Sequence, residues 1–287
     1  MIVSIPVPRG WRPLAGVDPK TLGATRLQLH HAAQLVTIAG RSLLPARADD
    51  SQTALEWLPE ARCFAGEWIG GWRTALRPAD LSLQILAKDG TAPAVLSLPG
   101  RTFSTALSWL QAEADQRGGG GAKLSRAVPY ALDAHPVATG APFHLEPLAE
   151  FIALDHYYGN AFALLSALAT SVPEASPIRC WPHHFDLATL ISFDAAGGDS
   201  VRTIGVGLSP GDAQYGEPYF YVTPWPYPQG VELPALAAGG HWHTAGWTGA
   251  VLTASALRAA DHGHEAARAA VFLEGAVQAC LQLLRAV

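Results

Sequence analysis

The amino-acid sequence predicts an α+β protein whose sheets are mainly antiparallel and flanked by helices. Segments with apolar residues at helical spacing alternate with short runs at the period of two that is typical of strands. The order helix, strands, helix occurs twice along the chain, which predicts a two-fold internal duplication. Hydrophobic residues make up 49% of the 287 residues and charged residues only 15%. This low charge indicates a large buried core or an oligomer interface, and we expect a homodimer.

Residues 1–117 are expected to form the first half, folded as helix, strands and helix. Leu27, Gln34 and Ile38 recur at helical spacing in its first helix. The pair Asp89-Gly90 is typical of a turn between two antiparallel strands. The predicted elements are a helix at 25–43, strands at 55–69, 81–86 and 94–98, and a helix at 104–117.

A glycine-rich joint and irregular linker, residues 118–146, follows the first half. The four consecutive glycines at 118–121 do not suit the interior of a helix or strand. Residues 147–287 then form a second half, and the two halves are expected to make one compact unit. Its predicted elements are a helix at 147–169, strands at 178–193, 202–208, 218–224 and 247–254, a turn at 197–199, and a helix at 264–284.

Charge and composition exclude several classes of partner. The formal net charge is −5, and no block of basic residues occurs, which argues against nucleic acid and against anionic membrane surfaces. The most apolar window, residues 151–172, contains Asp155, His156 and Asn160 and is interpreted as a buried helix of a soluble protein.

Cysteine usage and the first residues of the sequence predict a compartment. The three cysteines are widely spaced, so neither a thiolate zinc site nor a redox pair is expected. Residues 1–11 lack the features of a signal peptide. We therefore expect a protein of the reducing cytoplasm.

The aromatic, histidine-rich stretch 181–226 is the predicted working surface. His184 and Asp186 are two residues apart, so on a strand they share a face, and His183 points to the other face. Asp186 with His183 or His184 is thus the candidate catalytic group, as a carboxylate-oriented histidine or as two metal ligands. The alternative is a polar pair at a sheet edge or a hydrogen-bonded histidine of the core.

A second histidine pair predicts a metal site. His241 and His243 share a face if their segment is extended, and a nearby Asp186 or Glu217 could complete a site for zinc or non-haem iron. The alternative is a pair of loop histidines beneath neighbouring tryptophans.

Aromatic residues and a polar helix pair complete the candidate ligand-binding set. Tyr219 and Tyr221 share one face of a predicted strand, where they form either a pocket wall or plain core. His30 and Gln34 are four residues apart and lie on one face of the first helix, where they reach a shared site or remain a partly exposed face. The candidate ligand-binding residues are Tyr219, Tyr221, Trp225, His30, Gln34 and Glu217.

Several short motifs along the chain carry a family resemblance. They are Leu29-His30, Gln34 and Gly40-Arg41; Ser176-Pro177 and Phe185-Asp186-Leu187-Ala188; Pro218-Tyr219-Phe220-Tyr221; and Trp247, residues 249–252 and residues 267–284. In this order and spacing the chain resembles a bacterial family, the domain of unknown function 5996. The resemblance implies a single fold unit over nearly the whole chain, and it implies no established activity.

Three hypotheses about function remain open on the sequence alone. The first is a cytoplasmic protein that binds a small molecule in a pocket lined by Tyr219, Tyr221, Trp225, His183 and Asp186. The second is a metal-dependent hydrolase in which His184, Asp186, His241 and His243 hold an ion whose bound water is the nucleophile. The third is a non-enzymatic protein whose aromatic, weakly charged surface binds a protein partner.

Overall fold

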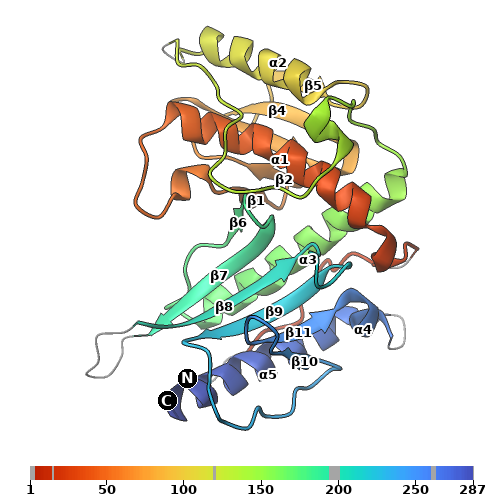
Figure 1. Ribbon diagram of the computed structural model, residues 1–287, viewed down its shortest axis with the longest axis vertical. Coiled ribbons are helices and arrows are strands. Elements are labelled where there is room, and N and C mark those ends of the chain that lie inside the picture. The colour runs from red at the N-terminus through yellow and green to blue at the C-terminus, as the bar shows by residue number, and fades with distance from the viewer. Residues whose placement is uncertain (1–3, 15, 119–120, 194–200, 260–262, 287) are drawn as a thin grey trace. The chain divides into compact units, whose positions relative to one another are not determined.

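The structure is a computed structural model that describes residues 4–14, 16–118, 121–193, 201–259 and 263–286 (Figure 1). Gly119 and Gly120 of the predicted joint and the predicted turn at 197–199 lie outside these residues. The helices are α1 (Gly23–Leu43), α2 (Phe103–Gln116), α3 (Leu148–Ser171), α4 (Ala254–Arg258) and α5 (Glu265–Ala286). The strands are β1 (Glu56–Leu58), β2 (Cys63–Ala65), β3 (Trp72–Arg77), β4 (Ser82–Ala87), β5 (Ala94–Ser97), β6 (Arg179–Trp181), β7 (Asp186–Phe193), β8 (Arg202–Ser209), β9 (Tyr219–Trp225), β10 (His241–His243) and β11 (Gly249–Thr253).

The described strands form two antiparallel sheets, which confirms the predicted α+β fold class. One sheet has the order β1-β2-β3-β4-β5 and the other has the order β10-β11-β9-β8-β7-β6. The first is a simple meander, whereas β10 and β11 exchange places at the edge of the second. Because the two strand orders differ in this way, the internal duplication is not confirmed.

The chain divides into two compact units that are each assembled from separate stretches. Unit 1 comprises Met1–Lys20, His156–Ile178 and Asp186–Val287, and unit 2 comprises Thr21–Asp155 and Arg179–Phe185. The predicted division at 118–146 does not coincide with these units, because that linker belongs entirely to unit 2. Helix α3 contributes residues to both.

Unit 2 contains the five-stranded sheet, and α1 packs against its strands β2 and β3. The predicted strand 55–69 is instead two short strands, since a turn at Arg62 (φ +51°) separates β1 from β2. Strand β3 was not predicted. Polar Arg73, Thr74 and Arg77 obscure its alternation, and pairing with β4 from Trp72↔Ala87 onward stabilises it nonetheless.

Unit 1 contains α5, which packs against β8, β9 and β11. Residues Glu265–Arg285 of this helix are long and apolar enough to cross a membrane, but 61% of the most apolar window is buried inside the structure. The apolar face of α5 therefore belongs to the core, as in a helix of a soluble domain. The short helix α4 was not predicted; the Thr253 side chain caps it by accepting a hydrogen bond from the backbone N–H of Ala256.

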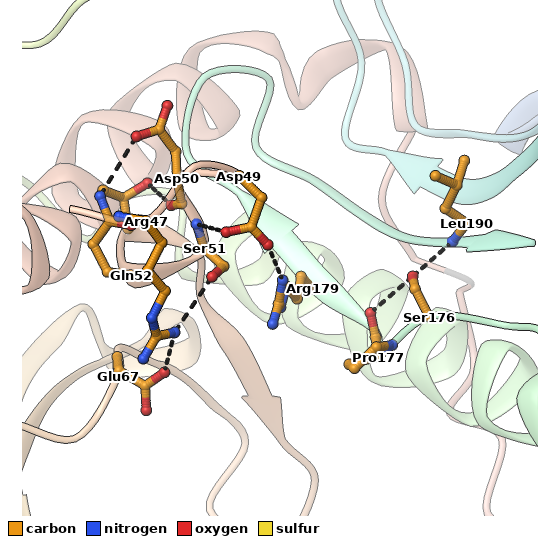
Figure 2. Close-up of polar contacts among 11 residues, drawn as sticks. Arg47, Asp49, Asp50, Ser51, Gln52, Glu67, Ser176, Pro177, Arg179 and Leu190 are labelled. Carbon is orange, nitrogen blue, oxygen red and sulfur yellow. Dashed lines mark hydrogen bonds and ion pairs between the residues drawn. The ribbon is translucent and has the colours of Figure 1, made fainter. Parts of the chain in front are cut away.

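In unit 2, a polar network at residues 47–52 fixes the chain beside α1 (Figure 2). The Arg47 backbone N–H donates to Gln52 Oε1 at 3.0 Å, and the Arg47 guanidinium donates to Ser51 Oγ at 3.3 Å. Asp49 pairs with Arg179 at 3.5 Å. The backbone carbonyl of Gln52 then lies so close to Gly40 that a Cβ there would be 2.2 Å from its oxygen. Glycine at this position is what permits the approach.

Candidate functional site

Among the buried polar side chains of helix α1, three lie on neighbouring turns at the middle of the helix. His30, His31 and Gln34 are 7%, 4% and 2% exposed. Polar groups are stable in a protein interior when they are hydrogen-bonded. The carbonyl oxygen of Pro182 accepts from His30 Nε2 at 2.8 Å and from Gln34 Nε2 at 2.9 Å. His30 and Gln34, the pair predicted on this helix face, therefore share one partner, Pro182, in the turn that follows β6.

The predicted strand 178–193 was wrong between residues 182 and 185, because this turn separates β6 from β7. The backbone N–H of Phe185 bonds to the carbonyl of Trp181 at 2.7 Å, and Phe185 has a φ of +59°. Since the strand is interrupted here, alternation does not place His184 and Asp186 on one face. The rings of His183 and His184 instead lie 4.4 Å apart, and both residues belong to unit 2, whereas Asp186 belongs to unit 1.

Burial of His30 changes the pKa of its imidazole. Desolvation lowers the pKa of His30 to about 4, although its bond to the Pro182 carbonyl acts in the opposite direction. The neutral ring stacks on Phe185 with centroids 5.2 Å apart and planes 6° from parallel. His30 is therefore a neutral structural donor at neutral pH.

We expect this titration to destabilise the protein in acid. The unfolded chain binds a proton at His30 near pH 6.5 and the folded chain only near pH 4, so the stabilising difference is complete above the first value and is lost as the pH falls between the two. The loss amounts to about 2 kcal/mol between pH 7 and pH 5. Chemical denaturation of wild type and His30→Gln at both pH values measures it, with exposed His264→Gln as control. Equal pH dependence in wild type and His30→Gln would contradict the assignment.

Tyr130 joins the buried polar residues of α1, and we call His30, His31, Gln34 and Tyr130 the α1 cluster. The Tyr130 hydroxyl donates to Gln34 Oε1 at 2.8 Å, and Arg41 lies over the Tyr130 ring with 5.6 Å from the guanidinium carbon to the centroid. The ring of His183 is 6.0 Å from that of Tyr130. The Gln34 amide N–H thus donates to Pro182 and its oxygen accepts from Tyr130, so Gln34 positions both Tyr130 and the 182–185 turn.

A cavity of about 220 Å³ opens beside this cluster in unit 2. His31 donates from Nε2 to the carbonyl of Asp133 at 3.0 Å, so in the neutral ring Nδ1 is the nitrogen that can accept a hydrogen bond. Arg126 lies over the ring of Phe103, 4.5 Å from its centroid, and donates to the carbonyl of Ala138 at 2.8 Å. No carboxylate among the described residues pairs with Arg126. The lining residues are His31, Gln34, Phe103, Arg126, Val128, Leu132 and Ala138; we call this the α1 cavity.

Of the predicted site residues, only Gln34 lines the α1 cavity. The sequence interpretation missed Arg126 and Tyr130 because they lie in the irregular stretch 121–135, where no periodicity assigns a side chain to a face. His31, which adjoins the predicted His30 in the sequence, was not selected. The available signal was the occurrence of charged and aromatic residues in a long segment without secondary structure, a type of loop that is often functional.

In unit 1, Asp186 and Tyr221 form a pair across three strands. The Tyr221 hydroxyl donates a hydrogen bond to the Asp186 carboxylate. Tyr221 on β9 lies opposite Gly207 on β8, and its ring crosses that glycine to reach the start of β7. A Cβ on Gly207 would be 2.7 Å from the Tyr221 hydroxyl. Gly207 therefore leaves the space that Tyr221 occupies.

Tyr219 lies on the same face of β9 and is tied to a turn. Its hydroxyl donates to Asp212 Oδ2 at 2.6 Å, and Asp212 Oδ1 accepts from the backbone N–H of Tyr215 at 2.8 Å. Burial and the Asp212 carboxylate raise the pKa of Tyr219. Tyr219 is only 6% exposed, whereas Trp225 at the other end of β9 is 55% exposed. Of the three residues of the predicted aromatic wall, Tyr219 is therefore buried, Tyr221 is hydrogen-bonded to Asp186, and Trp225 lies at the surface.

The two histidines of β10 do share a face, because β10 is a strand. Tyr215 Oη lies 3.1 Å from His241 Nε2 and 3.0 Å from His243 Nδ1. Glu217 does not join them; it is buried and accepts a hydrogen bond from the backbone N–H of Ser255 at 2.6 Å, at the start of α4. Within the described part of the chain, no three or more His, Cys, Asp or Glu side chains gather into a group that could hold a metal ion.

The chain was compared with protein-family models, with curated proteins and with solved structures. None of the three comparisons found a match. The resemblance to the domain of unknown function 5996 thus stays a prediction that depends on the quoted motifs. Function is therefore inferred from the chemistry of the α1 cavity and of the histidine pair on β10.

Proposed function

We propose that this protein binds a small organic acid in the α1 cavity of unit 2. The observation that carries the proposal is a cavity that combines the Arg126 guanidinium with apolar walls at Phe103 and Leu132. The cavity volume of about 220 Å³ is below the range of roughly 300–1,000 Å³ that holds drug-sized ligands. The ligand class is therefore a metabolite-sized compound.

The side chains of the cavity indicate the chemistry of the ligand. Arginine binds carboxylates through two parallel N–H···O bonds, and the stacked, hydrogen-bonded position of Arg126 reduces the entropy that such binding costs. In the neutral ring of His31, Nδ1 can accept one hydrogen bond. A carboxylate with an apolar body and one donor group, such as a hydroxyl or amine, matches this arrangement.

Binding of matched acids and amides tests the proposal. Calorimetric titration with benzoate, phenylacetate and hexanoate is paired with titration of the corresponding neutral amides. We expect at least one acid to bind at least about tenfold more tightly than its amide, because a charged hydrogen bond contributes about 1.5–3 kcal/mol.

A pair of arginine variants locates the binding site. Arg126→Gln is expected to lose about tenfold or more in affinity for the acid. Arg101→Gln is the matched control, because Arg101 is exposed and also donates to a backbone carbonyl, that of Ser97 at 3.1 Å. The proposal fails if no acid binds, or if both variants bind the acid as wild type does.

Free thiols support the proposal that this protein resides in a reducing compartment. Cys63, Cys180 and Cys280 are all buried and unbridged. Burial raises the pKa of the Cys63 thiol to about 11, which keeps it protonated and unreactive. Cytoplasmic residence is therefore part of the proposal.

A further inference from the structure

The edge strand β10 presents two imidazoles to one phenol in unit 1. His241 and His243 alternate with Trp242, whose indole N–H donates to the carbonyl of Pro234 at 2.7 Å. Pairing of β10 with β11 fixes this alternation, with His241 opposite Val251 and His243 opposite Gly249. The two histidines therefore project from the same face of the strand.

The hydrogen bonds determine the protonation of the cluster. His243 Nε2 lies 2.8 Å from the carbonyl oxygen of Ala245, which can only accept, so Nε2 carries the proton and Nδ1 offers its lone pair to Tyr215. The Tyr215 hydroxyl donates to that Nδ1 at 3.0 Å. Its oxygen then accepts from His241 Nε2 at 3.1 Å. The two histidine nitrogens thus each face the Tyr215 oxygen, with one proton in each of the two hydrogen bonds.

We propose that Tyr215, His241 and His243 bind a divalent transition metal ion such as Zn²⁺. Ligand atoms bonded to one ion at about 2.0–2.1 Å are roughly 2.9–3.4 Å from each other. The two nitrogen–oxygen distances in this cluster, 3.1 and 3.0 Å, lie within that interval. Three protein ligands leave a fourth tetrahedral position for water or another exogenous ligand.

Proton balance follows from the hydrogen bonds already described. On metal binding, His241 moves its proton from Nε2 to Nδ1 through solvent, and Tyr215 releases its phenolic proton. Tyrosine has an ordinary pKa of about 10, so the phenol is protonated at neutral pH before the ion arrives. One proton is therefore released for each ion bound, and affinity increases with pH.

Neighbouring residues hold the ligands in place. The indole of Trp247 stacks on His243 with centroids 4.5 Å apart and donates to Gln214 Oε1 at 2.9 Å. Asp212 Oδ1 accepts from the backbone N–H groups of Gln214 at 2.7 Å and of Tyr215 at 2.8 Å. Such outer partners orient metal ligands and maintain their tautomers. His241 is exposed, so an ion can reach the site from solvent.

Calorimetric titration of the full chain with Zn²⁺ tests this site. Wild type is expected to bind one equivalent, His241→Ala and His243→Ala each to bind at least about tenfold more weakly, and the double variant to bind none at this site. His264→Ala, a substitution of another exposed histidine in unit 1, is the control and should match wild type. Circular dichroism establishes that each variant is folded.

Copper(II) tests the role of the phenol. Wild type loaded with Cu²⁺ is expected to show a phenolate-to-copper absorption band in the visible region, and Tyr215→Phe should lack the band and bind Zn²⁺ more weakly. Zn²⁺ binding by the double histidine variant equal to that of wild type would overturn the site. An unchanged copper spectrum and Zn²⁺ affinity in Tyr215→Phe would overturn the proposed three-ligand set. The α1 cavity lies in the other unit, so neither result bears on organic-acid binding.

Discussion

Gly40→Ala is expected to destabilise the protein by about 3 kcal/mol, the upper end of the usual cost of overpacking, because the added Cβ would meet a rigid neighbour. A Cβ at this position would be 2.2 Å from the carbonyl oxygen of Gln52 and 3.3 Å from its carbonyl carbon. Both atoms are backbone, and the polar network of residues 47–52 limits how far they can move (Figure 2). Helix propensity alone would make the alanine variant more stable, so a loss of stability would show that the contact with Gln52 outweighs propensity.

Gly23→Ala is the matched control on the same helix. A Cβ at Gly23, the first residue of α1, meets nothing within 4 Å. Urea denaturation of both variants is expected to show a stability near or slightly above that of wild type for Gly23→Ala. Equal stabilities of the two variants would show that the approach of Gln52 to α1 is not rigid.

Phe185→Ala is expected to cost about 3–5 kcal/mol, the usual range for removing a fully buried aromatic ring. Phe185 is 1% exposed and packs between His30, at 5.2 Å between ring centroids, and Phe64, also at 5.2 Å. Its loss removes the ring against which His30 is stacked. Thermal and urea unfolding measure the change.

Phe185→Leu separates packing volume from backbone geometry. Both variants keep a side chain at φ +59°, so they share the backbone strain, and leucine retains much of the apolar contact. We expect Phe185→Leu to lose less than half as much stability as Phe185→Ala. A loss below about 1 kcal/mol for Phe185→Ala would mean that the ring does not contribute to the core of unit 2.

Local patterns in the sequence were sufficient to predict the fold class and most of the regular elements. The predicted helices at 25–43, 104–117 and 264–284 correspond closely to α1, α2 and α5. Their apolar residues repeat at helical spacing, which is a local property of the chain. The shared face of His241 and His243 was predictable only on the condition that their segment is extended, and pairing of β10 with β11 meets that condition.

Long-range packing, in contrast, determines which polar residues meet. The turn at Phe185 depends on a stacking partner on α1, and this partner, His30, is 155 positions earlier in the chain. Strand alternation therefore failed at 182–185, where a long-range contact stabilises a left-handed residue against its local preference. Arg126 reaches the α1 cavity from an irregular segment, and Tyr215 reaches His241 from a turn. In both cases the position of the side chain depends on packing between segments that no sequence periodicity relates.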